Sequence, residues 1–148
     1  MNRDLMFSSK NNAWCTPQDF FDKLDGEFQF TLDPCATSVS AKCNKFFTVD
    51  EDGLKQDWSK DRVFVNPPYG REIGKWVKKS YESSLGGALV VMLIPSRTDT
   101  RWWHDYIQDK AEVRFVKGRL KFVNLDSPEP RKMSSAPFPS AIIIYQTN

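Results

Sequence analysis

Residues 88–95 read ALVVMLIP and form the longest apolar run in the chain. The run is continuous rather than alternating, which is typical of a strand that is covered on both faces. Pro95 ends the strand, because proline lacks the N–H group that a sheet ladder requires. We therefore expect a central buried strand with a layer of structure on each side.

The sequence around this run predicts helices and strands in alternation. Helices are expected from Pro17 to a stop at Gly26, over 72–85 and within 99–109, and strands over 28–32, 46–49, 63–65, 112–116, 120–123 and 141–145. Thr16 is a good N-cap for the first helix, and a proline-rich loop is expected over 127–139. Alternation of this kind predicts an α/β sheet with helices on its faces.

The composition bounds the class of protein. The chain has 148 residues, enough for one core, and 40% of them are apolar. Its net charge is +2, so any basic surface for nucleic acid must be local. No apolar run approaches the roughly 18 residues of a membrane span, and residues 1–14 contain no apolar signal core, so we expect a cytoplasmic protein. Cys15, Cys35 and Cys43 lack CxxC spacing, which indicates reduced thiols, and no metal is expected.

Three predicted strands end in polar, unusual sequence. Leu32 leads into Asp33-Pro34, Val65 leads into Asn66, and Ile94 leads into Pro95-Ser96-Arg97. In open α/β sheets, ligands bind at the carboxyl ends of the strands. These three strand ends therefore predict the location of a binding site.

The middle strand continues as VFVNPPYG, residues 63–70. The Asn66 side-chain oxygen and the Pro67 carbonyl are two acceptors that suit the N–H bonds of a planar amine such as adenine. Pro67 and Pro68 restrict the backbone φ angles, so the loop is preorganised before a ligand binds, and Tyr69 offers a ring for stacking. Drawing both N–H bonds toward acceptors would free the lone pair of the amine for attack. The alternative is a rigid turn in which Tyr69 only packs.

The quartet Asn66-Pro67-Pro68-Tyr69 resembles motif IV of the S-adenosylmethionine-dependent amino-methyltransferases. The wider sequence resembles the phage-type DNA N6-adenine methyltransferases, a Dam-like family, from about Trp14 to the C-terminus. The segments that carry the resemblance are WCTP at 14–17, FTLDPCAT at 30–37, KCNKFFTVDEDGLKQDW at 42–58, VFVNPPYG at 63–70, PSRTDTRWWH at 95–104, RFVKGRLKF at 114–122 and APFPSA at 136–141.

The resemblance implies a Rossmann-like methyltransferase fold, a mixed and mostly parallel sheet with flanking helices, and S-adenosylmethionine as cofactor. The residues that it places at the cofactor are Thr16, Pro17, Asp33, Pro34, Cys35, Ala36, Asp50, Asp57 and Trp58. Several of them have a structural alternative: helix capping for Thr16-Pro17, a turn for Asp33, a solvated acidic cluster at 50–52, and the core for Trp58. The loop after Ala36 reads TSVS, where the family pattern continues into glycines.

The residues expected at DNA are exposed cations and aromatic rings. They are Arg97, Arg101, Trp102 and Trp103 after the central strand, with Arg119 and Lys121 as a second group near Arg131 and Lys132. The alternative places both tryptophans in the core and leaves the arginines in solvent. The partner implied is double-stranded DNA, bound by a monomer or a homodimer.

The expected function is methylation of a flipped-out adenine in DNA by a phage- or prophage-encoded enzyme. Two alternatives are a related amino-methyltransferase acting on cytosine-N4, RNA or protein glutamine, and a non-enzymatic nucleic-acid-binding module. The expected domain comprises residues 14–148, preceded by a flexible segment over residues 1–13.

Overall fold

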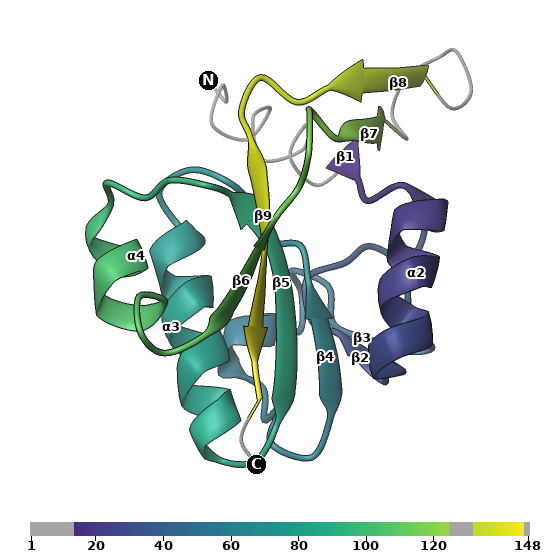
Figure 1. The fold of residues 1–148 in the computed structure, drawn as a ribbon. Coiled ribbons are helices and arrows are strands. Elements are labelled where there is room, and N and C mark those ends of the chain that lie inside the picture. Colours follow the sequence, from purple (N-terminus) through teal and green to yellow (C-terminus); the bar gives the residue numbers. More distant parts are fainter. Residues whose placement is uncertain (1–13, 125–131, 147–148) are drawn as a thin grey trace, which may run out of the picture.

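Strand β5 (Leu89–Pro95) is buried along its whole length and lies inside a six-stranded sheet (Figure 1). The structure is a computed structural model, and it describes residues 14–124 and 132–146. The strand order is β3 (Lys45–Phe46), β2 (Leu32–Asp33), β4 (Arg62–Val65), β5, β9 (Ser140–Tyr145) and β6 (Glu112–Phe115). The first four strands pair in parallel, while β9 is antiparallel to both of its neighbours.

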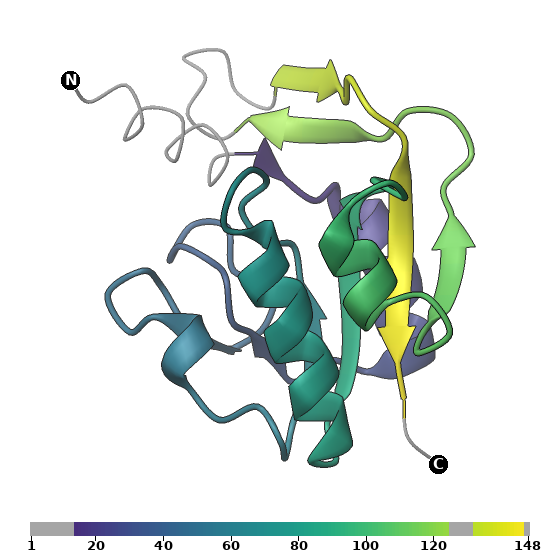
Figure 2. The same ribbon diagram turned by 90° about the vertical axis from the view of Figure 1, so that its left-hand side faces the viewer.

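Helices cover both faces of the sheet, as Figures 1 and 2 show. Helix α2 (Gln18–Phe28) lies on one face, and α3 (Ile73–Leu85) and α4 (Arg101–Tyr106) lie on the other. Along β5 the side chains alternate: Val90 and Met92 join the core cluster of α3 and α4, while Val91 joins that of α2. This confirms the predicted α/β class and the Rossmann-like arrangement, and it explains why the run lacks a polar face.

A second, smaller sheet lies beside the carboxyl ends of the parallel strands (Figure 2). It is antiparallel, in the order β1 (Trp14–Cys15), β7 (Lys121–Asn124) and β8 (Lys132–Ser135). Phe122 of β7 is buried in the core cluster that contains α2. Strand β8 lies inside the proline-rich stretch that we predicted as loop, so the loop prediction over 127–139 was wrong for residues 132–135. Arg131 and residues 1–13 lie outside the described residues.

The end of α2 corrects the sequence reading. The helix does not stop at Gly26 but continues to Phe28, whose ring is buried, and Gln29 then takes the left-handed conformation with φ 57°. The N–H of Gln29 donates to the Asp25 carbonyl over 2.7 Å, and the N–H of Phe30 donates to the Asp25 carboxylate over 2.8 Å. Burial of Phe28 therefore outweighs the helix-breaking tendency of glycine. The strand predicted over 28–32 shortens to Leu32–Asp33.

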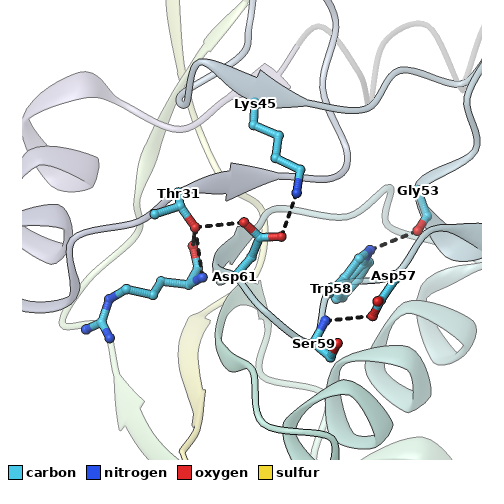
Figure 3. A network of polar contacts seen from close by, with 8 residues as sticks. Thr31, Lys45, Gly53, Asp57, Trp58, Ser59 and Asp61 are labelled. Atoms are coloured by element: carbon cyan, nitrogen blue, oxygen red, sulfur yellow. Dashed lines mark hydrogen bonds and ion pairs between the residues drawn. The ribbon is translucent and has the colours of Figure 1, made fainter.

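The amino ends of three strands are joined by one carboxylate (Figure 3). Asp61, just before β4, accepts hydrogen bonds from the Thr31 hydroxyl over 3.0 Å and from the Lys45 ammonium over 2.8 Å. Thr31 precedes β2, and Lys45 begins β3. The network fixes the edge of the sheet that lies opposite the predicted binding site. Strand β3 comprises only Lys45–Phe46, shorter than the predicted 46–49.

Candidate active site

The Asn66 amide is held at both of its polar atoms. Its Nδ2 donates to the Thr16 hydroxyl oxygen over 3.2 Å, and its Oδ1 accepts from the Tyr69 hydroxyl over 2.7 Å. The Tyr69 hydroxyl also lies 3.1 Å from the Leu93 carbonyl of β5, so two acceptors compete for one phenolic proton. The quartet is therefore anchored to the segment before α2 and to the central strand.

The Tyr69 ring is partly buried and packs edge-on against two phenylalanines. The centroid distances are 6.4 Å to Phe122 and 5.5 Å to Phe138, with interplanar angles of 77° and 82°. Loss of solvent around the phenol raises the pKa of Tyr69 well above its usual value, so the hydroxyl stays protonated. The Tyr69 hydroxyl therefore remains a hydrogen-bond donor throughout the pH range in which proteins are folded.

Thr16 does not cap α2, which corrects the sequence prediction. The helix begins at Gln18, its N-cap is Pro17, and no side chain caps it. The Thr16 side chain is buried, with 2% of the residue exposed, and its hydroxyl contacts Asn66 instead. Neither Thr16 nor Pro17 lines either of the two hollows described below.

Asp33 is buried at the end of β2 and orders the loop that follows. Its carboxylate accepts from the N–H of Lys42 over 3.0 Å and faces the N–H of Cys35 at 3.4 Å. Burial raises the pKa of Asp33 to about 7, although these two N–H groups oppose the shift. The carboxyl thus makes the turn contacts of the structural alternative and still lies at the predicted strand end.

Hydroxyl groups stabilise the loop where the family pattern has glycines. The N–H of Thr37 donates to the Ser40 hydroxyl over 2.9 Å, and the N–H of Ser40 donates to the Thr37 hydroxyl over 3.0 Å. These reciprocal bonds satisfy backbone groups within the turn. The TSVS sequence therefore gives an ordered loop without glycine.

The first hollow lies between the loops after β2 and β3. Its lining consists of Pro34, Cys35, Ala36, Thr48, Val49, Asp52, Gly53 and Trp76. Three of the predicted cofactor residues are among these: Pro34, Cys35 and Ala36. Of the acidic cluster, Asp52 lines the hollow, whereas Asp50 is exposed and the Glu51 carboxylate accepts from the N–H of Thr48 over 2.7 Å.

Gly53 is a site residue that sequence reasoning missed. A Cβ atom at this position would lie 2.0 Å from the Pro34 carbonyl oxygen and 3.2 Å from the Trp76 ring. Only glycine fits, because the loops after β2 and β3 meet here backbone to backbone. The signal in the sequence was a glycine directly after the acidic cluster that follows the predicted strand 46–49.

Trp58 contacts two residues that line this hollow, Gly53 and Trp76, and Figure 3 shows its hydrogen bond to Gly53. Its indole N–H donates to the Gly53 carbonyl over 2.9 Å, its ring stacks on Trp76 at 6.1 Å, and the residue is fully buried. The core alternative therefore describes Trp58. Asp57 is exposed and accepts from the N–H of Ser59 over 2.9 Å, so it forms a turn outside the hollow.

The second hollow adjoins the quartet through Tyr69. Its lining consists of Tyr69, Gly70, Ile73, Pro95, Arg97, Thr100 and Trp102. Arg97 is exposed and Trp102 is partly buried, so a cation and an indole ring face the same space. Thr100 is the N-cap of α4, and its hydroxyl accepts from the N–H of Trp103 over 3.3 Å.

The other predicted DNA residues divide into surface and core. Arg101 is exposed and lies 3.9 Å from the Asp105 carboxylate, while Trp103 is 3% exposed and belongs to the core, as the alternative held. Arg119 and Lys121 are exposed near the turn between β6 and β7. Neither lines either of the two hollows described above, and no ion pair holds them within the part of the chain that the structure describes.

The cysteines and other possible metal ligands do not form a cluster in the described residues. Cys15, Cys35 and Cys43 are unbridged, and burial raises the pKa of Cys35 and Cys43. Within residues 14–124 and 132–146, no group of three His, Cys, Asp or Glu residues is placed to hold a metal ion. None of the helices described there is long and apolar enough to cross a bilayer.

The whole sequence was compared with known proteins. The family described as DNA N-6-adenine-methyltransferase (Dam) matches residues 5–148. The chain belongs to this family. It is 31% identical over 111 residues to the DNA N-6-adenine-methyltransferase of Escherichia phage T1, and 26% identical over 140 residues to that of Haemophilus phage HP1.

The two relatives differ in length. The alignment with the phage T1 protein covers 74% of this chain and 46% of the relative, so the chain spans about half of that protein's length. The alignment with the phage HP1 protein covers 93% of this chain and 81% of the relative. Membership of the Dam family confirms the resemblance found in the sequence, and it agrees with the position of the Asn66-Pro-Pro-Tyr69 quartet at a strand end.

Proposed function

We propose that this protein transfers a methyl group from S-adenosylmethionine to the N6 amine of adenine in DNA. The observation that carries the proposal is the position of Asn66. Its side-chain oxygen and the Pro67 carbonyl follow directly after β4. In the sheet β4 lies between β2, whose following loop lines the first hollow, and β5, whose following loop lines the second. One hollow would hold the cofactor and the other the target base.

The first hollow suits the adenosine part of the cofactor. Its walls are mostly apolar, from Val49, Pro34 and the edge of Trp76, and Asp52 contributes a carboxylate. A flat base fits against apolar walls, and ribose hydroxyls are good donors to a carboxylate. When bound, S-adenosylmethionine supplies an electrophilic methyl group on a positively charged sulfur.

The quartet would act on the target amine. The exocyclic nitrogen of adenine is a weak nucleophile, because its lone pair is delocalised into the ring. Asn66 Oδ1 and the Pro67 carbonyl would accept its two N–H bonds and make the lone pair available. In the free protein Oδ1 already accepts from the Tyr69 hydroxyl, so the incoming amine exchanges one donor for another.

The second hollow suits a base that has left the duplex. Tyr69 and Trp102 provide rings for it, and Arg97 is exposed beside them. Arg97 and Arg101 would contact phosphates, with Arg119 and Lys121 as a further cationic group. The roles of these residues are part of the proposal, and protection of phage DNA inside the host cell is the biological purpose that we propose for it.

The test is methyl transfer from labelled S-adenosylmethionine to duplex DNA, RNA and protein in parallel. We expect label in DNA alone, recovered as N6-methyladenine after digestion to nucleosides. An Asn66→Ala variant provides the blank for contaminating activity. Label recovered as N4-methylcytosine, or in RNA or protein, would assign the alternative chemistry, and no label in any substrate would contradict the enzymatic proposal.

A further inference from the structure

We propose that Thr16 is a positioning residue that holds the Asn66 amide in its reactive orientation. This inference rests on the proposed function, because it concerns how the acceptor of that reaction is aligned. Thr16 lines neither of the two hollows, and its hydroxyl contacts the Asn66 amide.

The contact joins two distant parts of the chain. Thr16 Oγ1 accepts from Asn66 Nδ2 over 3.2 Å, across 50 residues of sequence. Thr16 directly follows β1, and β1 pairs with β7 through Cys15 and Val123. The hydroxyl is therefore presented from a backbone that is itself fixed in the small sheet.

Burial makes this contact specific. Only 2% of Thr16 is exposed, so its hydroxyl has little access to water, and α2 does not use it as a cap. A buried hydroxyl without a partner is costly, which favours retention of the bond to Asn66. Sequence alone assigns Thr16 to helix capping or to the cofactor; in the structure it does not cap the helix, and its hydroxyl contacts Asn66.

The geometry decides which atom of the amide faces the target. With Nδ2 held by Thr16, Oδ1 points to the other side, where the Tyr69 hydroxyl now donates to it. When an adenine amine replaces that hydroxyl, Thr16 is the contact of Asn66 that remains. Without the bond to Thr16, the Asn66 amide can rotate and place its NH₂ group, instead of Oδ1, against the N–H groups of the adenine amine. Two donors would then face each other, and the acceptor would be lost.

The experiment compares Thr16→Val with Thr16→Ser in single-turnover methyl transfer to DNA at saturating cofactor. Valine keeps the shape but loses the hydroxyl, and serine keeps the hydroxyl. Contacts that orient a functional group are typically worth about ten- to a hundredfold in activity. We expect a loss of that size in Thr16→Val, near-normal turnover in Thr16→Ser, and S-adenosylmethionine affinity within about twofold of the parent in both.

A double-mutant cycle separates positioning from general damage. In an Asn66→Ala background, Thr16→Val should cause almost no further loss, because the side chain that it positions is gone. Thr31→Val is the matched control: it removes another hydroxyl that donates hydrogen bonds, to the Asp61 carboxylate and the Arg62 carbonyl, at the opposite edge of the sheet. Its turnover should equal that of the parent. Thr16→Ala is measured alongside, in case valine disturbs the fold.

Several results would overturn the inference. Parent-like turnover in both Thr16→Val and Thr16→Ala would mean that the bond has no role in alignment. A loss that is fully additive with Asn66→Ala, or a fall in cofactor affinity with unchanged turnover at saturation, would assign Thr16 to the fold or to the cofactor. An inactive parent protein would instead contradict the proposed function, so the two failures are distinguishable.

Discussion

The Thr16 hydroxyl accepts a hydrogen bond from the Asn66 amide, 3.2 Å away and 50 positions later in the chain. The segment before the first helix is therefore part of the candidate active site. Tyr69 approaches the same amide from the other side, at 2.7 Å. Three side chains from two segments thus form one hydrogen-bonded unit at the end of β4.

Replacing Asn66 by alanine should abolish most turnover. Loss of one preorganised polar contact at a reacting centre costs roughly 2.7–4 kcal/mol, which corresponds to about a hundred- to a thousandfold in rate. Cofactor affinity should hardly change, since Asn66 does not line the first hollow. Single-turnover kinetics measures the first effect and calorimetry the second. Near-normal turnover in a folded Asn66→Ala protein would show that the quartet is only a rigid turn without a catalytic role.

Tyr69→Phe and Tyr69→Ala should differ. Phenylalanine keeps the ring that lines the second hollow, so we expect it to retain much of the base capture while losing roughly 1 kcal/mol of stability with the hydroxyl contacts. Alanine also removes the ring and should weaken capture by roughly 1–3 kcal/mol. Binding of DNA containing an unpaired adenine, with thermal unfolding as control, checks both. Equal losses would show that the hydroxyl, not the ring, matters.

Arg97 and Arg101 should contribute to DNA affinity without regard to sequence. Each phosphate contact that is lost should lower the slope of log affinity against log salt concentration by about 0.9. The double alanine variant should therefore bind all duplexes more weakly and with a shallower slope. Lys60 and Lys110 are exposed cations at the opposite edge of the sheet, and their double alanine variant is the control. An unchanged slope in the arginine variant would show that neither Arg97 nor Arg101 contacts a phosphate.

Gly53→Ala should disrupt the first hollow. The added Cβ would lie 2.0 Å from the Pro34 carbonyl oxygen, so one of the two loops must move. Overpacking of this kind typically costs about 1–3 kcal/mol. We expect a lower unfolding temperature and weaker binding of S-adenosylmethionine by calorimetry. Gly26→Ala, where the Cβ meets nothing within 4 Å, is the control and should lose neither.

Asp33 should make stability depend on pH in an unusual direction for a carboxylate. Its pKa is about 7 in the folded protein, and about 3.9 is usual in an unfolded chain. Between these values the unfolded state has released the proton and the folded state has not, so the free energy of unfolding falls as pH rises from about 4 to 7. Asp33→Asn should flatten that part of the profile in denaturant titrations. An unchanged profile would show that Asp33 is ionised in the fold.

The sequence predicted the parts of this molecule that local pattern controls. The continuous apolar run of β5, the helix before it and the proline stop after β4 all follow from side-chain burial and backbone chemistry. The Thr16–Asn66 bond and the Gly53–Pro34 approach depend on pairs of segments that meet only in the fold, and no periodicity encodes them. Trp58 and Trp103 were predicted as ligand contacts, because the sequence does not distinguish a tryptophan buried in the core from one that lines a binding site.

The orientation of β9 has a practical consequence for preparing the protein. Tyr145, its last residue, pairs with Val90 near the amino end of β5, whereas β1 leads directly into Thr16 at the candidate active site. A tag attached directly after β9 would therefore start from the edge of the sheet that contains Asp61. A tag attached directly ahead of β1 would start near the Asn66 amide, where it would interfere with the DNA of the proposed reaction.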